Sequence, residues 1–258
     1  MDDLIQDNLS RIEREHGVKI LWACESGSRA WGFPSPDSDY DVRFIYAHDP
    51  AHYLRVFDKR DVIEEPISGV LDISGWDIKK ALGLLRKSNP ALREWLSSPI
   101  VYRRDAAGMT PLLSLVDEAF LPLASCQHYL SMARDDIRKL AEDRDLRLKK
   151  YLYMFRALLA CRWVTTHGTQ PPMRFQGLLD AFLPGGDIRE QVDELLEMKS
   201  RVLESELIPP QPDLDEYLLR LYGQLEAALP KQVTPPAAER FDACLRETLR
   251  VVWPGWGC

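Results

Sequence analysis

The order of apolar and polar positions divides the chain into two parts. In the first part, short apolar runs alternate with turn-rich segments, which is typical of a small sheet with a few helices. Residues 18–24 are mostly β-branched, aromatic or otherwise apolar and follow a glycine, which predicts a buried strand. Residues 39–46 alternate in polarity. Because successive side chains of a strand point to opposite faces, Asp39, Asp41 and Arg43 are expected on one face.

Further elements are expected on both sides of these strands. Residues 3–15 carry apolar side chains separated by polar ones and predict a short surface helix. Residues 61–76 predict two more strands, the second beginning near residue 70. Asp77 follows at the position of a helix N-cap, and the helix that it caps is expected to reach Lys87.

Beyond about residue 105, the apolar positions recur at helical spacing. Proline lacks the amide donor and clashes with the preceding turn, so the proline-containing breaks are expected to separate helices. The helical segments are 110–167, 174–183, 187–206, 213–229 and 236–252. The expected fold class is therefore α+β. Residues 1–105 would form a domain with a small mixed sheet and flanking helices, and residues 106–258 an all-α helical domain.

The composition describes a folded chain and excludes some function classes. Of the 258 residues, 45% are hydrophobic and 28% charged, as in an ordinary globular protein. The net charge of −7 argues against a protein that coats nucleic acid over its whole surface, but it leaves room for a local basic groove. The five cysteines show no C-x-x-C spacing, the first residues form no apolar signal run, and no stretch is apolar enough to span a membrane. We expect a cytoplasmic protein without a membrane partner.

The most informative segment joins a glycine-serine pair to two aspartates. Gly27 and Ser28 follow the first predicted strand, and Asp39 and Asp41 lie on the next one. Carboxylates two residues apart on one face of a strand are only about 7 Å apart along the backbone, and they repel each other unless a cation lies between them. Mg²⁺ suits this position, since it binds one or two carboxylates together with phosphate oxygens. Glycine lets the backbone approach a ligand closely, and a serine hydroxyl with adjacent amides holds phosphate.

These residues resemble a known family. Gly27-Ser28 followed by Asp39-x-Asp41 is similar to the signature of the DNA polymerase β-type nucleotidyltransferases. The longer segments 27–46 and 72–102 resemble a narrower bacterial and phage group, the predicted nucleotidyltransferases related to RNA-ligase-associated polymerases. The resemblance covers about residues 20–105, and it extends more loosely to 147–156 and 171–173. It implies a polymerase β-like catalytic domain.

The resemblance also implies two-metal chemistry. Asp39 and Asp41 would hold two Mg²⁺ ions, for which Mn²⁺ is a possible substitute. A third carboxylate on a neighbouring strand would bind metal and help to activate the attacking hydroxyl. Asp72, inside the predicted strand, is the favoured candidate, and Asp77 is the alternative, although helix capping already explains an aspartate there. Gly27 would seat the triphosphate, together with the serine that follows it.

Several basic residues are candidate nucleotide contacts. The guanidinium groups of Arg29 and Arg43 are suited to phosphate, although Arg43 could equally neutralise the carboxylate face. The resemblance suggests that Lys149, Lys150 and Arg156 reach the nucleotide from the helical domain. A solvated basic helix face is the alternative for these three residues.

The expected function is Mg²⁺-dependent transfer of a nucleoside monophosphate from an NTP, ATP included, to an acceptor hydroxyl, with release of pyrophosphate. An RNA 3′ end is the favoured acceptor, and a protein hydroxyl, as in protein AMPylation, is the competing one. A catalytically silent, nucleotide-binding regulatory module is the alternative from another class. The sequence makes no prediction of the oligomeric state.

Two histidine patterns suggest further sites. Arg162 and His167 match the R-x4-H spacing of HEPN-type ribonucleases, so a ribonuclease regulated by the first domain is a further alternative, but the motif is short and a structural role for His167 is favoured. His48 and His52 flank a proline, with no cysteine or third histidine nearby, so no zinc site is expected there.

Overall fold

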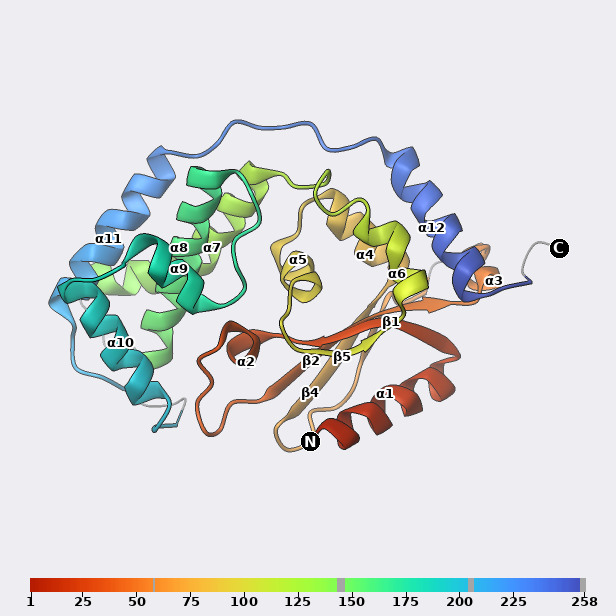
Figure 1. The fold of residues 1–258 in the computed structure, drawn as a ribbon, viewed down its shortest axis with the longest axis horizontal. Helices are drawn as coiled ribbons and strands as arrows, with labels where there is room; N and C mark the ends of the chain where they lie inside the picture. Colours follow the sequence, from red (N-terminus) through yellow and green to blue (C-terminus); the bar gives the residue numbers. More distant parts are fainter. Residues whose placement is uncertain (58, 143–146, 204–206, 256–258) are drawn as a thin grey trace. The chain divides into compact units, whose positions relative to one another are not determined.

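The computed structural model describes residues 1–57, 59–142, 147–203 and 207–255. Within them lies a mixed sheet with the strand order β3-β4-β2-β1-β5 (Figure 1). The strands are β1 (Val18–Glu25), β2 (Tyr40–His48), β3 (Val62–Glu64), β4 (Leu71–Asp77) and β5 (Val101–Arg104). β2 and β4 run parallel, whereas the other neighbouring pairs are antiparallel. The predicted α+β class and its mixed sheet are confirmed.

Most helices follow the sheet in the chain. The helices of the first 120 residues are α1 (Asp2–His16), α2 (Gly27–Trp31), α3 (Pro50–Tyr53), α4 (Ile78–Arg86), α5 (Pro90–Leu96) and α6 (Ala106–Leu113). The later helices are α7 (Pro122–Ala141), α8 (Leu148–His167), α9 (Phe175–Phe182), α10 (Asp187–Lys199), α11 (Pro212–Ala227) and α12 (Ala238–Val252). Among the described helices, none combines the length and the apolar composition that crossing a bilayer requires.

Helices cover both faces of the sheet. Ile5 and Leu9 of α1 pack in one core cluster with Val42 and Phe44 of β2. Ile45, the next residue of β2, points to the opposite face and belongs to a second cluster that includes residues of α4, α5, α6 and α12 (Figure 1). The alternation predicted for β2 is thus confirmed. Both faces of the middle of β2 are thus buried, whereas its first residues are polar and only partly buried.

The local sequence explains where these elements begin and end. Asp77 caps α4 by accepting a hydrogen bond from the Lys79 amide at 2.7 Å, and the helix ends at Arg86 with Lys87 as its C-cap, within one residue of the predicted end. The short helix α5 was not predicted, although Asn89 caps it through the Leu92 amide at 3.0 Å. Strand β5 was also missed, because its half-exposed residues show no continuous apolar run.

The helices α7 to α11 form their own packed region. Almost every turn of α8 is buried, which marks it as the central helix of this region. It ends at Gly168, whose φ of 66° closes the helix in the left-handed conformation that glycine adopts without strain. Trp31 lies edge-to-face against Tyr153 of α8, with ring centroids 5.2 Å apart.

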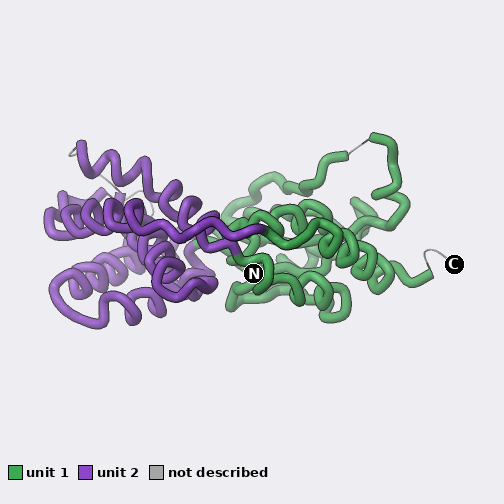
Figure 2. The backbone as a smooth tube through the Cα atoms, turned by 90° about the horizontal axis from the view of Figure 1, so that it is seen from above, with its two compact units in different colours: residues 1–27, 39–120, 235–258 green, residues 28–38, 121–234 purple. Residues whose placement is uncertain are grey.

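The contacts divide the chain into two compact units (Figure 2). Unit 1 comprises residues 1–27, 39–120 and 235–258, and unit 2 comprises residues 28–38 and 121–234. The domain boundary expected after residue 105 stays a prediction. The units differ from it in three respects: residues 106–120 and α12 belong with the sheet in unit 1, and residues 28–38 belong with the helices of unit 2.

Candidate active site

Two of the predicted carboxylates are neighbours in the sheet. Asp41 of β2 pairs in register with Asp72 of the parallel strand β4. The side chain of Arg43 lies between them: its Nη2 is 2.9 Å from Asp41 Oδ1 and 2.7 Å from Asp72 Oδ2. All three side chains are less than one-third exposed. Arg43 therefore neutralises the carboxylate face, which was one of the two roles considered for it.

The positions of the Asp41 and Asp72 carboxylates suit a divalent ion. Oxygens of both carboxylates lie within 2.9 Å of the same guanidinium nitrogen, so one cation can contact both at once. Carboxylate oxygens are the ligands that Mg²⁺ prefers, and the pair therefore fits such an ion. Asp39 stands one residue before β2 and is exposed. Its part in metal binding stays a prediction.

The glycine turn lies directly against Asp41. Gly27 has a φ of 60°, and a Cβ atom built on it would fall 2.3 Å from Asp41 Oδ2. The preceding residue, Ser26, donates its amide to the Asp41 carbonyl at 2.9 Å. Only glycine leaves room for the carboxylate here and also accepts this backbone conformation. The predicted proximity of the glycine turn and the aspartates is thus present for Gly27 and Asp41.

Replacement of Gly27 by alanine is expected to lower both stability and transfer activity. The left-handed conformation costs about 1–2 kcal/mol for a residue with a Cβ atom. The added methyl group also displaces the Asp41 carboxylate, so we expect transfer to fall about tenfold or more. Thermal unfolding and an NTP transfer assay measure the two effects.

Gly17→Ala is the matched control, because Gly17 has a φ of 63° and nothing within 4 Å of its Cβ position. It should be destabilised to a similar extent and keep its transfer rate. Equal loss of transfer in both variants would show that strain alone, and not the position of Asp41, limits activity.

A third acidic residue, which was not predicted, lies beside Asp41. Glu25, at the end of β1, is fully buried, and its Oε1 accepts a hydrogen bond from the Asp41 amide at 2.9 Å. Its Oε2 accepts a hydrogen bond from the Tyr102 hydroxyl, and burial together with this carboxylate raises the pKa of Tyr102. An acidic residue that closes an apolar strand just before the glycine turn was the available signal. Glu25 positions β2 at the level of Asp41.

Ser28 and Arg29 lie in α2 and hydrogen-bond to the loop that follows it in unit 2. The Ser28 hydroxyl donates to Ser38 Oγ at 3.1 Å, and Arg29 Nη2 donates to the Ser38 carbonyl at 2.8 Å. The loop also receives Lys199 of α10, whose Nζ donates to Ser35 Oγ at 3.0 Å. Lys199 is almost fully buried and was not predicted. These contacts hold the loop in shape, and phosphate binding by Ser28 and Arg29 stays a prediction.

The three basic residues of α8 lie in different surroundings. Lys150 forms an ion pair with Asp136 at 3.0 Å, and Lys149 is half-buried. Arg156 is 2% exposed, and its guanidinium carbon lies 4.1 Å from the ring centroid of Trp31. This cation–π contact gives Arg156 a packing role inside unit 2. Nucleotide binding by the three residues stays a prediction.

Asp77, the other candidate for the third carboxylate, has a structural role. Asp77 is 3% exposed, caps α4, and accepts a hydrogen bond from the Tyr53 hydroxyl at 2.9 Å. Burial raises its pKa to about 6. It lies five residues beyond Asp72 on β4, about 16 Å at a rise of roughly 3.3 Å per residue. The geometry thus favours Asp72 as the partner of Asp41.

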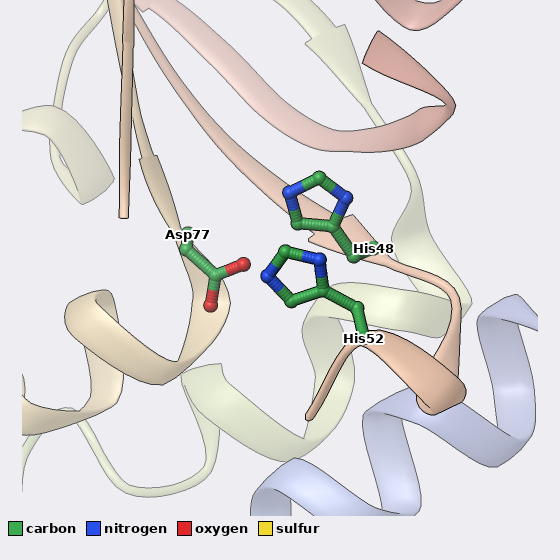
Figure 3. Close-up of side chains that lie close together, drawn as sticks. All are labelled: His48, His52 and Asp77. Atoms are coloured by element: carbon green, nitrogen blue, oxygen red, sulfur yellow. The ribbon is translucent and has the colours of Figure 1, made fainter. Parts of the chain in front are cut away.

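Asp77 instead meets the two histidines that have no cysteine or third histidine near them in the sequence. His48 ends β2, His52 lies in α3, and ligand atoms of all three residues lie within 4.8 Å of one another (Figure 3). β4 thus brings an aspartate that is distant in sequence beside the two histidines, and the expectation that no zinc ion binds here stays a prediction.

The R-x4-H pair lies against an aromatic ring. The Arg162 guanidinium carbon is 4.9 Å from the Phe182 centroid, and the His167 ring is 6.2 Å from the same centroid. His167 also packs against Trp163 at 4.3 Å. These contacts account for both residues by packing on α9.

The paired carboxylates and the glycine turn on a mixed sheet are the features expected of a polymerase β-type nucleotidyltransferase. The chain belongs to the RNA repair pathway DNA polymerase beta family, whose model matches residues 1–247. This confirms the resemblance inferred from Gly27, Ser28, Asp39 and Asp41.

Two individual proteins are similar to this chain. An uncharacterized protein of Bacillus subtilis (strain 168), YcgL, is 49% identical over 207 residues, which cover 80% of each chain. Among solved structures, a nucleotidyltransferase-like protein from Exiguobacterium sibiricum 255-15 is 12% identical, with a TM-score of 0.31 over 86% of this chain and 78% of that chain. The family assignment does not depend on this second likeness.

Proposed function

We propose that this protein is an Mg²⁺-dependent nucleotidyltransferase that moves a nucleoside monophosphate from an NTP to the 3′ hydroxyl of an RNA and releases pyrophosphate. The observation that carries the proposal is the register pairing of Asp41 with Asp72 beside Gly27. Membership in an RNA repair family supports RNA as the acceptor.

The residues of the chain have distinct tasks in this reaction. Asp39, Asp41 and Asp72 would hold the metal ions, which supply charge neutralisation and a lower pKa of the attacking hydroxyl. The RNA 3′ oxygen forms a bond to the α-phosphorus, the bond to the bridging oxygen of the β-phosphate breaks, and pyrophosphate leaves. Asp72 accepts the proton of the hydroxyl. Before substrate binds, Arg43 offsets the repulsion between Asp41 and Asp72.

The test is incubation of the protein with each labelled NTP, Mg²⁺ and a mixed pool of RNA, tRNA and protein. Label at RNA 3′ ends supports the proposal. Label on protein would replace it with AMPylation, and NTP binding without any label transfer would indicate a silent regulatory module. RNA cleavage that persists without Mg²⁺ would favour the Arg162/His167 ribonuclease.

Lys149 and Lys150 are expected to contribute to NTP binding. A triphosphate and the carboxylates of Asp39, Asp41 and Asp72 together carry more negative charge than two Mg²⁺ ions cancel, so additional cations stabilise the complex. Lys149→Ala/Lys150→Ala should raise the KM for NTP more than tenfold, equivalent to about 1.4 kcal/mol. Steady-state kinetics measure this effect.

Arg138→Ala/Lys139→Ala is the control, because it removes the same charge and Lys139 is also a partner of Asp136, at 3.1 Å. Its KM should stay within about twofold of the unmodified protein. An unchanged KM for NTP in the Lys149→Ala/Lys150→Ala variant would show that this part of α8 does not bind the nucleotide.

A further inference from the structure

Unit 1 contains a second polar site, at the opposite end of β2 and β4 from Asp41 and Asp72. A cavity of about 370 Å³ lies between α3, the start of α4 and the residues that follow α3. Five of its lining residues are basic: Arg55, Lys59, Arg60, Lys79 and Lys80. We call this cavity the basic pocket.

The charge of the basic pocket is opposite to that of the chain. Only two acidic residues, Asp61 and Asp77, lie among the residues that line it, against five basic ones. Asp61 is paired with Lys80 at 2.9 Å, Arg60 is paired with Glu64 outside the lining, and Asp77 is buried under the Tyr53 hydroxyl, so the excess positive charge comes from Arg55, Lys59 and Lys79. A chain with a net charge of −7 thus concentrates positive charge at one cavity. Such a concentration attracts an anion.

A metal ion fits the pocket less well, although His52 and Asp77 line it and lie close to His48. The two imidazole rings are stacked at 3.6 Å with an interplanar angle of 4° (Figure 3). Their lone pairs lie in parallel ring planes and do not converge on one ion. Burial lowers the pKa of His52, and the charge of Arg55 lowers it further, so the imidazole is held neutral. The basic side chains that line the pocket oppose a cation and favour an anion.

We propose that the basic pocket binds backbone phosphates of the acceptor RNA strand, upstream of its 3′ end. This inference rests on the proposed function. Phe57, which also lines the pocket, is 83% exposed, and an exposed aromatic ring beside basic side chains is suited to stacking a base of a single strand. The neutral imidazole of His52 adds a hydrogen-bond donor for a phosphate oxygen.

The sheet sets the length of RNA that the pocket can reach. Asp77 lies five residues beyond Asp72 on β4, about 16 Å along the strand. A stacked strand rises about 3.4 Å per nucleotide, so roughly five nucleotides separate the reacting 3′ end from the pocket. An acceptor shorter than this would not reach it.

The test compares two variants that lose the same charge. Arg55→Ala/Lys79→Ala removes two exposed cations of the pocket, and the control Arg14→Ala/Lys87→Ala removes two exposed cations away from it. Fluorescence anisotropy without NTP measures the affinity for single-stranded RNAs of about twelve and of three nucleotides. For the longer RNA we expect the pocket variant to bind about tenfold more weakly. The slope of the logarithm of the binding constant against the logarithm of the salt concentration should also be smaller by about 1.4, because each of the two lost phosphate contacts to a single strand contributes roughly 0.7.

The control variant should bind both RNAs like the unmodified protein, and the pocket variant should bind the trinucleotide normally. Equal weakening in both variants, or no weakening in either, would overturn the proposal. Zn²⁺ binding by calorimetry that His52→Ala abolishes, together with unchanged RNA affinity in the pocket variant, would assign the cavity to a metal. Because RNA binding is measured without NTP, a failure of nucleotidyl transfer does not affect this test, and unchanged thermal unfolding verifies that both variants fold.

Discussion

Replacement of Asp41 by asparagine is expected to abolish nucleotidyl transfer, with a loss of at least about a hundredfold, since even residues that only support a metal ligand contribute 10–100-fold. Asp41 is the carboxylate that contacts the glycine turn, faces Asp72 and receives Arg43. Asparagine keeps the shape of the side chain but loses the charge that would hold Mg²⁺. Single-turnover transfer at saturating NTP and RNA measures the loss.

The fold should survive this change. Arg43 keeps its ion pair with Asp72, and partly exposed ion pairs contribute only about 0–1 kcal/mol. We therefore expect the melting temperature to shift by no more than about 4 °C, given roughly 2–4 °C per kcal/mol for a chain of this size. Asp37→Asn, in the loop before β2, is the control and should keep its activity. Full activity in the Asp41 variant would exclude two-metal transfer at this site.

Replacement of Asp72 by asparagine is expected to remove turnover while NTP binding remains. In the proposed mechanism Asp72 takes the proton of the attacking hydroxyl, and an amide cannot accept it. We expect kcat to fall at least about a hundredfold, because general-base catalysis contributes about 10²–10⁴-fold. The Kd for NTP, measured by calorimetry with Mg²⁺ present, should change much less.

Asp77→Asn separates the two candidates for this role. Asparagine is also a good N-cap and keeps an acceptor for the Lys79 amide, so the variant should lose about 0.5–2 kcal/mol of stability at most. Its kcat at saturating RNA should stay close to that of the unmodified protein. If Asp77→Asn abolished turnover and Asp72→Asn did not, the assignment of the third carboxylate would be reversed.

The sequence alone was sufficient for those features that depend on residues close together in the chain. Alternation along β2 placed Asp41 and Arg43 on one face and Val42 and Phe44 on the other, because the side-chain period of a strand is two. Asp77 was recognisable as an N-cap since capping depends on the next few residues. The glycine-serine pair and the two aspartates lie close together in the chain, so their pattern was sufficient to indicate the family.

Contacts between distant residues were decided only by the tertiary structure. The pairing of Asp41 with Asp72 depends on strand register, and register is specified by burial on both faces of the sheet. In the same way Glu25 meets the Asp41 amide, α12 returns to the sheet, and Asp77 joins the two histidines. No period or spacing encodes these contacts, because each arises from how separate elements pack together. The basic pocket has the same origin: its cations come from separate parts of the chain, so the net charge of −7 did not reveal it.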